Sequence, residues 1–231
     1  MPAMAPGLAP GWPWPHGACY DLPDSAAGQK KMKLYINERS GNAYKPRLLL
    51  SLLGVPYERV AVDLAKREQK QPRFLELNPR GQVPVLEDEG QVFWDSTAVL
   101  VYVARKYGGE RWLPTDPAGM AAVMQWMALA QNEIHYGLQF ARAILHLGRA
   151  GNLAECQQYG RTALRVLEKR LADQEWLALQ HMTIADVACF PYVAMAPDAD
   201  VELGPYRAVS AWIDSIKALP GYIAVPARRP A

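Results

Sequence analysis

Cysteine is scarce in this sequence. The 231 residues contain three, Cys19, Cys156 and Cys189, an odd number spread far apart with no Cys-x-x-Cys pair. Disulfide frameworks and cysteine-based zinc sites need paired or closely spaced cysteines, so the sequence argues against both as the basis of the fold. Because free thiols persist in reducing compartments, we expect a cytoplasmic protein.

An excess of charge of either sign is also lacking. Lys and Arg number 25 against 23 Asp and Glu, a formal net charge of +2, and basic residues stand next to acidic ones, as in Lys66-Arg67-Glu68. Such mixed clusters are typical of solvated helix faces. Nucleic-acid-binding surfaces concentrate positive charge on one face, so we expect no nucleic acid among the partners.

Long apolar runs and closely spaced histidines are missing as well. The apolar runs fall short of the roughly 20 residues that a membrane span needs, and the N-terminus has no basic start followed by an apolar stretch. His135 and His146 stand farther apart than the one-turn spacing of helical metal ligands. We therefore expect neither a membrane partner nor a bound metal.

Residues 1–31 differ in composition from the rest of the chain. They are rich in Pro, Gly and Ala and show hardly any hydrophobic periodicity. This composition predicts a disordered extension. The sequence leaves open whether Trp12 and Trp14 dock on the body of the protein.

Residues 32–111 alternate between strand and helix patterns. Residue alternation and turn signals predict strands over Lys33–Asn37, Glu58–Val62, Val83–Leu86 and Val92–Trp94. Helical spacing predicts helices over Leu48–Leu53, Lys66–Leu77 and Thr97–Tyr107. A βαβ unit followed by a ββα unit implies a mixed four-stranded sheet covered by helices.

Residues 112–231 contain no convincing strand. Helical spacing predicts one long helix from Pro117 to about Gly148, and others over Leu153–Asp173, from Thr183, and over Pro205–Leu219. Thr183 and Asp186 match the [ST]-x-x-[DE] capping box, which closes the first turn of a helix. The predicted fold class is α/β plus all-α, an α/β domain followed by a helical bundle.

Three segments of the chain resemble the cytosolic glutathione transferase family. They are KLYINERSGNAYKPR from Lys33, NPRGQVPVL from Asn78 with WDSTA from Trp94, and TIADV from Thr183. Their order and spacing make the resemblance specific, and the loop after the first strand is similar to that of bacterial, serine-type members. The resemblance implies a thioredoxin-like N-terminal domain, glutathione as co-substrate, and a homodimer.

The resemblance also suggests where glutathione binds. Val83 would pair with the glutathione backbone through its N–H and C=O, with Pro84 following a cis peptide bond; a trans proline that begins the strand is the alternative. Asp95 and Ser96 are helix-cap residues, and a helix N-terminus favours the carboxylate of the γ-glutamyl end. Capping and binding are compatible roles.

Two glutamines occupy positions that resemble the family's site for the glycine carboxylate of glutathione. Gln69 and Gln82 are neutral where relatives often carry His or Lys. Simple surface exposure is the alternative interpretation for both residues.

A side-chain hydroxyl is needed to ionise the glutathione thiol. Ser40 follows the first strand and precedes the first helix, where serine-type members keep theirs, and Asn42 would assist. The alternatives are that both residues only form a turn and cap the helix, or that Tyr35 or Tyr44 supplies the hydroxyl. With Ala43 in this loop and no cysteine nearby, a cysteine-based mechanism is disfavoured.

The long predicted helix carries candidates for a second-substrate pocket. Met124, Tyr136 and Phe140 would offer adaptable apolar surface to an electrophile, although such residues at helical spacing commonly belong to the core.

The function expected from these residues is a glutathione transferase that activates the thiol for attack on an electrophilic, largely apolar substrate. A glutathione-dependent disulfide or peroxide reductase is the second candidate. A non-catalytic binding module with this fold is the third.

Overall fold

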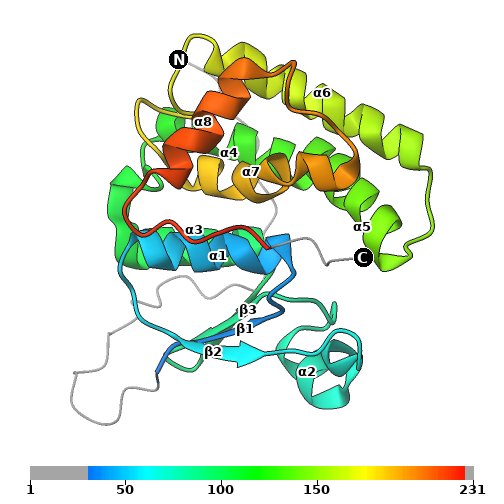
Figure 1. Cartoon of the computed structure of the whole chain (residues 1–231). Coiled ribbons are helices and arrows are strands. Elements are labelled where there is room, and N and C mark those ends of the chain that lie inside the picture. Colours follow the sequence, from blue (N-terminus) through cyan, green and yellow to red (C-terminus); the bar gives the residue numbers. More distant parts are fainter. Residues whose placement is uncertain (1–30, 227–231) are drawn as a thin grey trace, which may run out of the picture.

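The computed structural model describes residues 31–226 (Figure 1). Residues 1–30, which include Cys19, lie outside the described residues. The extension expected over residues 1–31 therefore stays a prediction. No helix within residues 31–226 is long and apolar enough to cross a membrane.

A mixed four-stranded sheet forms the first half of the described chain. Its strands are β1 (Lys33–Ile36), β2 (Glu58–Ala61), β3 (Val85–Asp88) and β4 (Gln91–Trp94), in the spatial order β2-β1-β3-β4. β1 pairs with β2 in parallel and with β3 antiparallel, and β3 pairs with β4 antiparallel. The predicted mixed sheet is confirmed.

The helices of this half differ in detail from the prediction. They are α1 (Gly41–Leu52), α2 (Pro72–Leu77) and α3 (Ser96–Val103), with the short 3₁₀ helices η1 (Glu68–Lys70) and η3 (Gly109–Arg111). The π-helical segment η2 (Ala104–Gly108) continues α3, so the helix predicted over Thr97–Tyr107 is helical throughout. A single helix over Lys66–Leu77 was wrong, because Pro72 has no N–H and Gln71 before it is extended, at φ −75° and ψ 147°. α1 begins before the apolar run that predicted it, because Ser40 caps its first turn.

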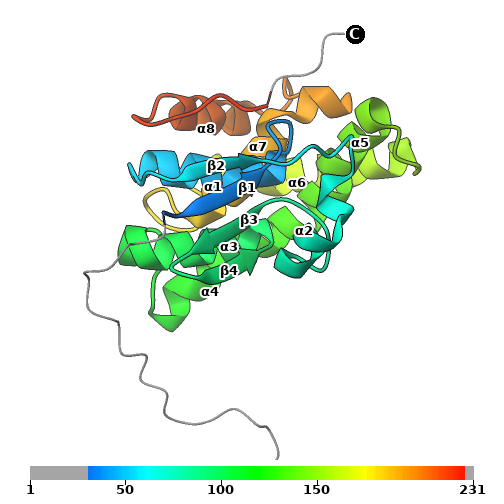
Figure 2. The same cartoon turned by 90° about the horizontal axis from the view of Figure 1, so that it is seen from below.

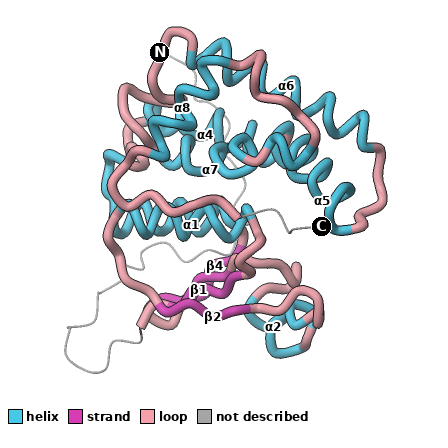
Figure 3. Tube along the Cα trace, in the orientation of Figure 1, coloured by secondary structure: helices cyan, strands magenta, loops and turns pink. Residues whose placement is uncertain are grey.

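The second half of the described chain is helical, as Figure 3 shows. Its helices are α4 (Pro117–Gln131), η4 (His135–Gln139), α5 (Phe140–Leu147), α6 (Leu153–Leu171), α7 (Ile184–Ala194), η5 (Ala196–Ala199) and α8 (Arg207–Lys217). The single long helix from Pro117 to Gly148 was wrong. Asn132 leaves the helical region at φ −105° and ψ −95°, and its side chain donates to the Ala128 carbonyl (2.9 Å).

Two helices connect the halves of the described chain. Figures 1 and 2 show α1 and α3 between the sheet and the layer formed by α4 to α8, with α1 packed against α7. Residues 220–226 run along α1, where Ser51 Oγ donates to the Gly221 carbonyl (2.7 Å) and the buried Tyr44 hydroxyl donates to the Ile223 carbonyl (2.6 Å). α1 is thus enclosed by the sheet, α7 and the C-terminal segment.

The predicted capping box at α7 is confirmed and extends further than expected. The buried Asp186 carboxylate accepts hydrogen bonds from the backbone N–H of Thr183 (2.9 Å), the backbone N–H of Leu177 (3.0 Å) and the indole N–H of Trp212 (3.1 Å). One side chain therefore joins the start of α7, the loop before it and α8.

We predict that Asp186→Ala lowers the free energy of unfolding by about 3 kcal/mol, because it leaves three buried donors without acceptors. Denaturant unfolding measures the loss. The exposed Asp173→Ala is the matched control and should change stability by less than about 0.5 kcal/mol. A loss for Asp186→Ala as small as that of the control would contradict the proposed role of the carboxylate.

We also predict that Gly41→Ala destabilises the protein, although Gly→Ala inside a helix commonly stabilises by about 0.5 to 1 kcal/mol. A Cβ at Gly41 would lie 2.7 Å from the Tyr192 ring and 3.0 Å from Met195 Cε, where α1 meets α7. We expect a loss of about 1 to 3 kcal/mol in denaturant unfolding. Gly204→Ala, where an added Cβ meets nothing within 4 Å, is the control. Equal effects of the two substitutions would refute the tight contact.

Candidate functional site

Ser40 occupies the junction between β1 and α1. It is half-buried and extended, and its Oγ accepts a hydrogen bond from the backbone N–H of Ala43 (3.2 Å), which makes it the N-cap of α1. The capping role foreseen from the sequence is therefore confirmed. Capping uses an oxygen lone pair, so the hydroxyl proton remains available to donate.

Asn42 lies in the first turn of α1, two residues after Ser40. Its side-chain Oδ1 is buried and finds no hydrogen-bond partner within residues 31–226. A buried amide oxygen without a partner is costly and indicates a position where a donor belongs.

The two tyrosines considered as alternatives have their hydroxyl protons engaged. Tyr44 donates to the Ile223 carbonyl, and burial raises its pKa far above the ordinary value. Tyr35 donates to Glu87 Oε2 (3.1 Å), and its pKa is raised by burial and then by this carboxylate. Neither hydroxyl has the free proton that Ser40 retains.

The turn before β3 presents an open stretch of backbone. The Val83–Pro84 peptide bond is cis, as predicted. Neither the N–H nor the C=O of Val83 forms a hydrogen bond with any part of the chain that the structure describes. Asn78, which is 1% exposed, fixes the turn by donating to the Gln82 carbonyl (2.8 Å).

The two candidate glutamines are placed differently by the structure. Gln82 is exposed, whereas Gln69 is half-buried and its Oε1 has no partner among the described residues. A Cβ at Gly81 would lie 2.6 Å from the Gln69 carbonyl, so the turn carrying Gln82 lies directly against Gln69. The structure therefore brings the two segments together.

Asp95 and Ser96 lie at the start of α3. Asp95 has a positive φ of 76°, and its carboxylate accepts from the Thr97 backbone N–H (2.9 Å), forms a salt bridge with Arg80 (2.7 Å) and accepts from Gln131 Nε2 of α4 (3.1 Å). Ser96 is the first residue of the helix and is 4% exposed. Arg80 and Gln131 could not be predicted as partners of Asp95, because both reach it from other segments of the chain.

A buried lysine of α1 and a half-buried histidine of η4 were also missed. Lys45 is 1% exposed, with its ammonium 5.7 Å from the centre of the Tyr192 ring, and burial lowers its pKa to about 8. Burial, and then the positive charge of Lys45, lower the pKa of His135 to about 4, so this imidazole is neutral at pH 7. The only sequence signal was a lysine at a core-facing position of α1.

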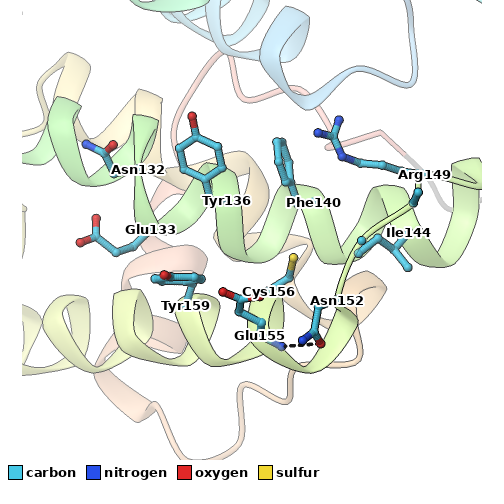
Figure 4. A pocket seen from close by; sticks show the side chains of 12 residues that line it. Asn132, Glu133, Tyr136, Phe140, Ile144, Arg149, Asn152, Glu155, Cys156 and Tyr159 are labelled. Carbon is cyan, nitrogen blue, oxygen red and sulfur yellow. Dashed lines mark hydrogen bonds between the residues drawn. The ribbon is translucent and has the colours of Figure 1, made fainter.

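A pocket of about 490 Å³ lies between the α4–η4–α5 segment and the start of α6 (Figure 4). Tyr136 and Phe140 are among its lining residues and pack edge to face, with ring centres 5.1 Å apart. Met124 is not among them. It stands two turns before the break at Asn132 and packs against the core instead.

No group of three or more His, Cys, Asp or Glu side chains suited to holding a metal occurs among the described residues.

Comparison with protein families gives two matches. The model of the glutathione S-transferase N-terminal domain matches residues 30–105, and that of the C-terminal domain matches residues 147–220. A glutathione S-transferase D7 of Anopheles gambiae is 33% identical over 74% of this chain and 78% of its own length.

Other relatives carry other activities in their names. A maleylacetoacetate isomerase of Pseudomonas aeruginosa is 32% identical over 86% of this chain and 98% of its own. A disulfide-bond oxidoreductase of Escherichia coli is 28% identical over 78% of this chain and 87% of its own.

Among solved structures, a possible glutathione S-transferase from Rhodopseudomonas palustris matches with a TM-score of 0.79 and 34% identity, over 87% of this chain and all of that one. The two domain models, the extent of the relatives and this structural match agree: the chain belongs to the glutathione S-transferase family.

Proposed function

We propose that this protein binds glutathione across the edge of its sheet, ionises the thiol through Ser40, and transfers the thiolate to an electrophilic carbon of a largely apolar acceptor. The observation that carries the proposal is the Ser40 hydroxyl, which caps α1 and keeps its own proton free. Family membership makes glutathione the co-substrate.

Ser40 and α1 can together supply the energy for thiol ionisation. A thiol of pKa about 8.5 is only a few per cent ionised at pH 7, and lowering its pKa by about two units takes roughly 2.7 kcal/mol. A hydrogen bond to a charged group contributes about 1.5 to 3 kcal/mol. The N-terminus of α1 adds about 0.3 to 1 kcal/mol, and the Asn42 amide can donate from the same turn.

The backbone of glutathione would bind at the Val83 turn. The unbonded N–H and C=O of Val83, ahead of the cis bond to Pro84, can pair with the cysteinyl unit of glutathione as a short added strand. Gln69 and Gln82 would donate their amides to the glycine carboxylate.

The γ-glutamyl end would bind at α3. Its carboxylate fits the first-turn N–H groups and the hydroxyl of Ser96, while its ammonium fits the Asp95 carboxylate. Arg80 and Gln131 hold that carboxylate in place through the contacts at 2.7 Å and 3.1 Å.

The acceptor would bind in the pocket lined by Tyr136 and Phe140, whose rings offer flat apolar surface. Met124 can act there only indirectly, through the packing of α4. Conjugation of electrophiles with glutathione in this way would serve detoxification.

Reduction of small disulfides is the second candidate function, supported by the name of one relative, and the loop between β1 and α1 bears on its mechanism. Ala43 stands in that loop, the two described cysteines are elsewhere, and burial raises the pKa of the Cys189 thiol, so glutathione itself would supply the attacking sulfur. The Escherichia coli relative bears a disulfide oxidoreductase name, and peroxide reduction would use the same thiolate. A non-catalytic binding module remains the third candidate, since Gln69 and Gln82 are neutral.

We further propose a cytoplasmic homodimer, as the family resemblance implies. The edge strand β4 offers an apolar surface for a second subunit, with Val92 38% and Trp94 39% exposed. Light scattering of the purified protein tests the dimer.

Ser40→Gly tests the assignment of the hydroxyl. Glycine is nearly as good an N-cap as serine, so the variant should keep α1 and lose at most a few tenths of a kcal/mol of stability. We expect the pKa of bound glutathione, followed by thiolate absorbance, to rise by about one to two units. The kcat/KM for a chlorodinitrobenzene acceptor should fall about 10- to 100-fold at pH 7.

Ser40→Thr keeps a hydroxyl and is the matched control, with a thiol pKa close to that of the parent protein. An unchanged thiol pKa in Ser40→Gly would exclude Ser40 as the activating group. No glutathione binding at millimolar concentration by calorimetry would instead favour the binding module. Disulfide turnover with no transfer to any carbon acceptor would favour the reductase.

A further inference from the structure

Arg149 stands at one end of the pocket described above. Its guanidinium carbon lies 3.7 Å from the centre of the Phe140 ring, so the side chain is stacked on the aromatic wall. Within residues 31–226 it forms no salt bridge, although Arg142, close by in sequence, is buried and paired with Asp198 (3.2 Å). A stacked guanidinium with free donors is suited to bidentate recognition of a planar anion.

The start of α6 adds positive potential at the same end. Gly151 and Asn152 line the pocket, and Asn152 is the N-cap of this helix, which runs over Leu153–Leu171. A helix N-terminus carries a partial positive charge that favours anions. The helix end adds to the positive charge of Arg149, and the Glu155 carboxylate in the first turn of α6 offsets part of that addition.

Two carboxylates also line the pocket: Glu133 is away from this end, whereas Glu155 is in the first turn of α6, beside Asn152. In Figure 4 Glu133 lies at the opposite end of the lining from Arg149, and Glu155 lies along α6. The rings of Tyr136, Phe140 and Tyr159 stand between. Arg149, which has no ion-pair partner among the described residues, thus stands at one end of an aromatic surface, with Glu133 at the other end.

We propose that Arg149 is a specificity-determining residue that selects acceptors carrying a carboxylate at one end of a flat conjugated body. The carboxylate would pair with the guanidinium, and the conjugated body would lie on Tyr136 and Phe140. That the pocket receives the acceptor rests on the function proposed above. The preference for a carboxylate is a property of the pocket and can be measured without any reaction.

A matched pair of unreactive ligands isolates the carboxylate. The probes are 3,5-dinitrobenzoate and 3,5-dinitrobenzamide, which differ in one anionic group, titrated by calorimetry with S-methylglutathione present to occupy the glutathione positions. We expect the benzoate to bind about tenfold or more tightly than the amide. Arg149→Gln should abolish this preference, Arg149→Lys should retain part of it, and Arg165→Gln, an exposed arginine of α6 outside the pocket, should leave it intact.

Transfer is then measured with 4-chloro-3,5-dinitrobenzoate and the corresponding benzamide. The thiolate sulfur forms a bond to the ring carbon, the carbon–chlorine bond breaks, chloride leaves with its electron pair, and the thiol proton passes to solvent. Arg149→Gln should lower kcat/KM for the benzoate about 10- to 100-fold and change that for the amide by less than about threefold. Comparing variants cancels the different intrinsic reactivities of the two acceptors.

The outcomes separate this inference from the proposed function. Equal losses for both acceptors would mean that Arg149 only supports Phe140, and would overturn the inference. Equal binding of benzoate and amide by the parent protein would overturn it as well. A binding preference that depends on Arg149, with no transfer to either acceptor, would uphold the anionic subsite while the transferase function fails.

Discussion

The packing of α1 between the sheet, α7 and the C-terminal segment is the constraint on which the rest of the structure depends. Because Gly41 has no side chain, the Tyr192 ring can lie so close to its backbone that an added Cβ would be only 2.7 Å away. Tyr44 is held in place by the hydrogen bond that its hydroxyl donates to the Ile223 carbonyl. Because both contacts lie in the first turns of the helix, the position of its N-terminus is set by the helical half of the chain. The Ser40 hydroxyl caps that N-terminus, so its position in the candidate site depends on how α1 packs against α7.

Lys45 shows the energetic cost of this arrangement. A lysine that is 1% exposed loses most of its hydration, and its lowered pKa of about 8 reflects that loss. The Tyr192 ring and the negative charge of Asp95 stabilise the ammonium group. Asp95 is the carboxylate that Arg80 and Gln131 contact at the start of α3.

Local sequence patterns were enough to predict much of the fold, whereas the features that depend on long-range contacts were missed. The strands, the capping box and the cis bond at Pro84 were predictable because short segments encode them, through alternation, cap chemistry and the family motif. The break at Asn132 was not, since an asparagine in a helical run is compatible with either outcome until its side chain finds the Ala128 carbonyl. Gln131 and Arg149 were missed for the same reason: what they contact depends on how the segments around that break are arranged.

That break also bears on the proposed division between a fixed thiol site and a variable acceptor site. Most of the groups proposed for glutathione lie at the ends of segments whose backbone is held by the sheet and by α1 and α3. The pocket is lined instead by residues of η4, α5 and the connection to α6, many of them exposed. Side chains there can change without unfolding the protein, so acceptor selection can diverge while thiol activation is retained. Relatives named as transferase, isomerase and disulfide oxidoreductase at about 30% identity are consistent with such a division.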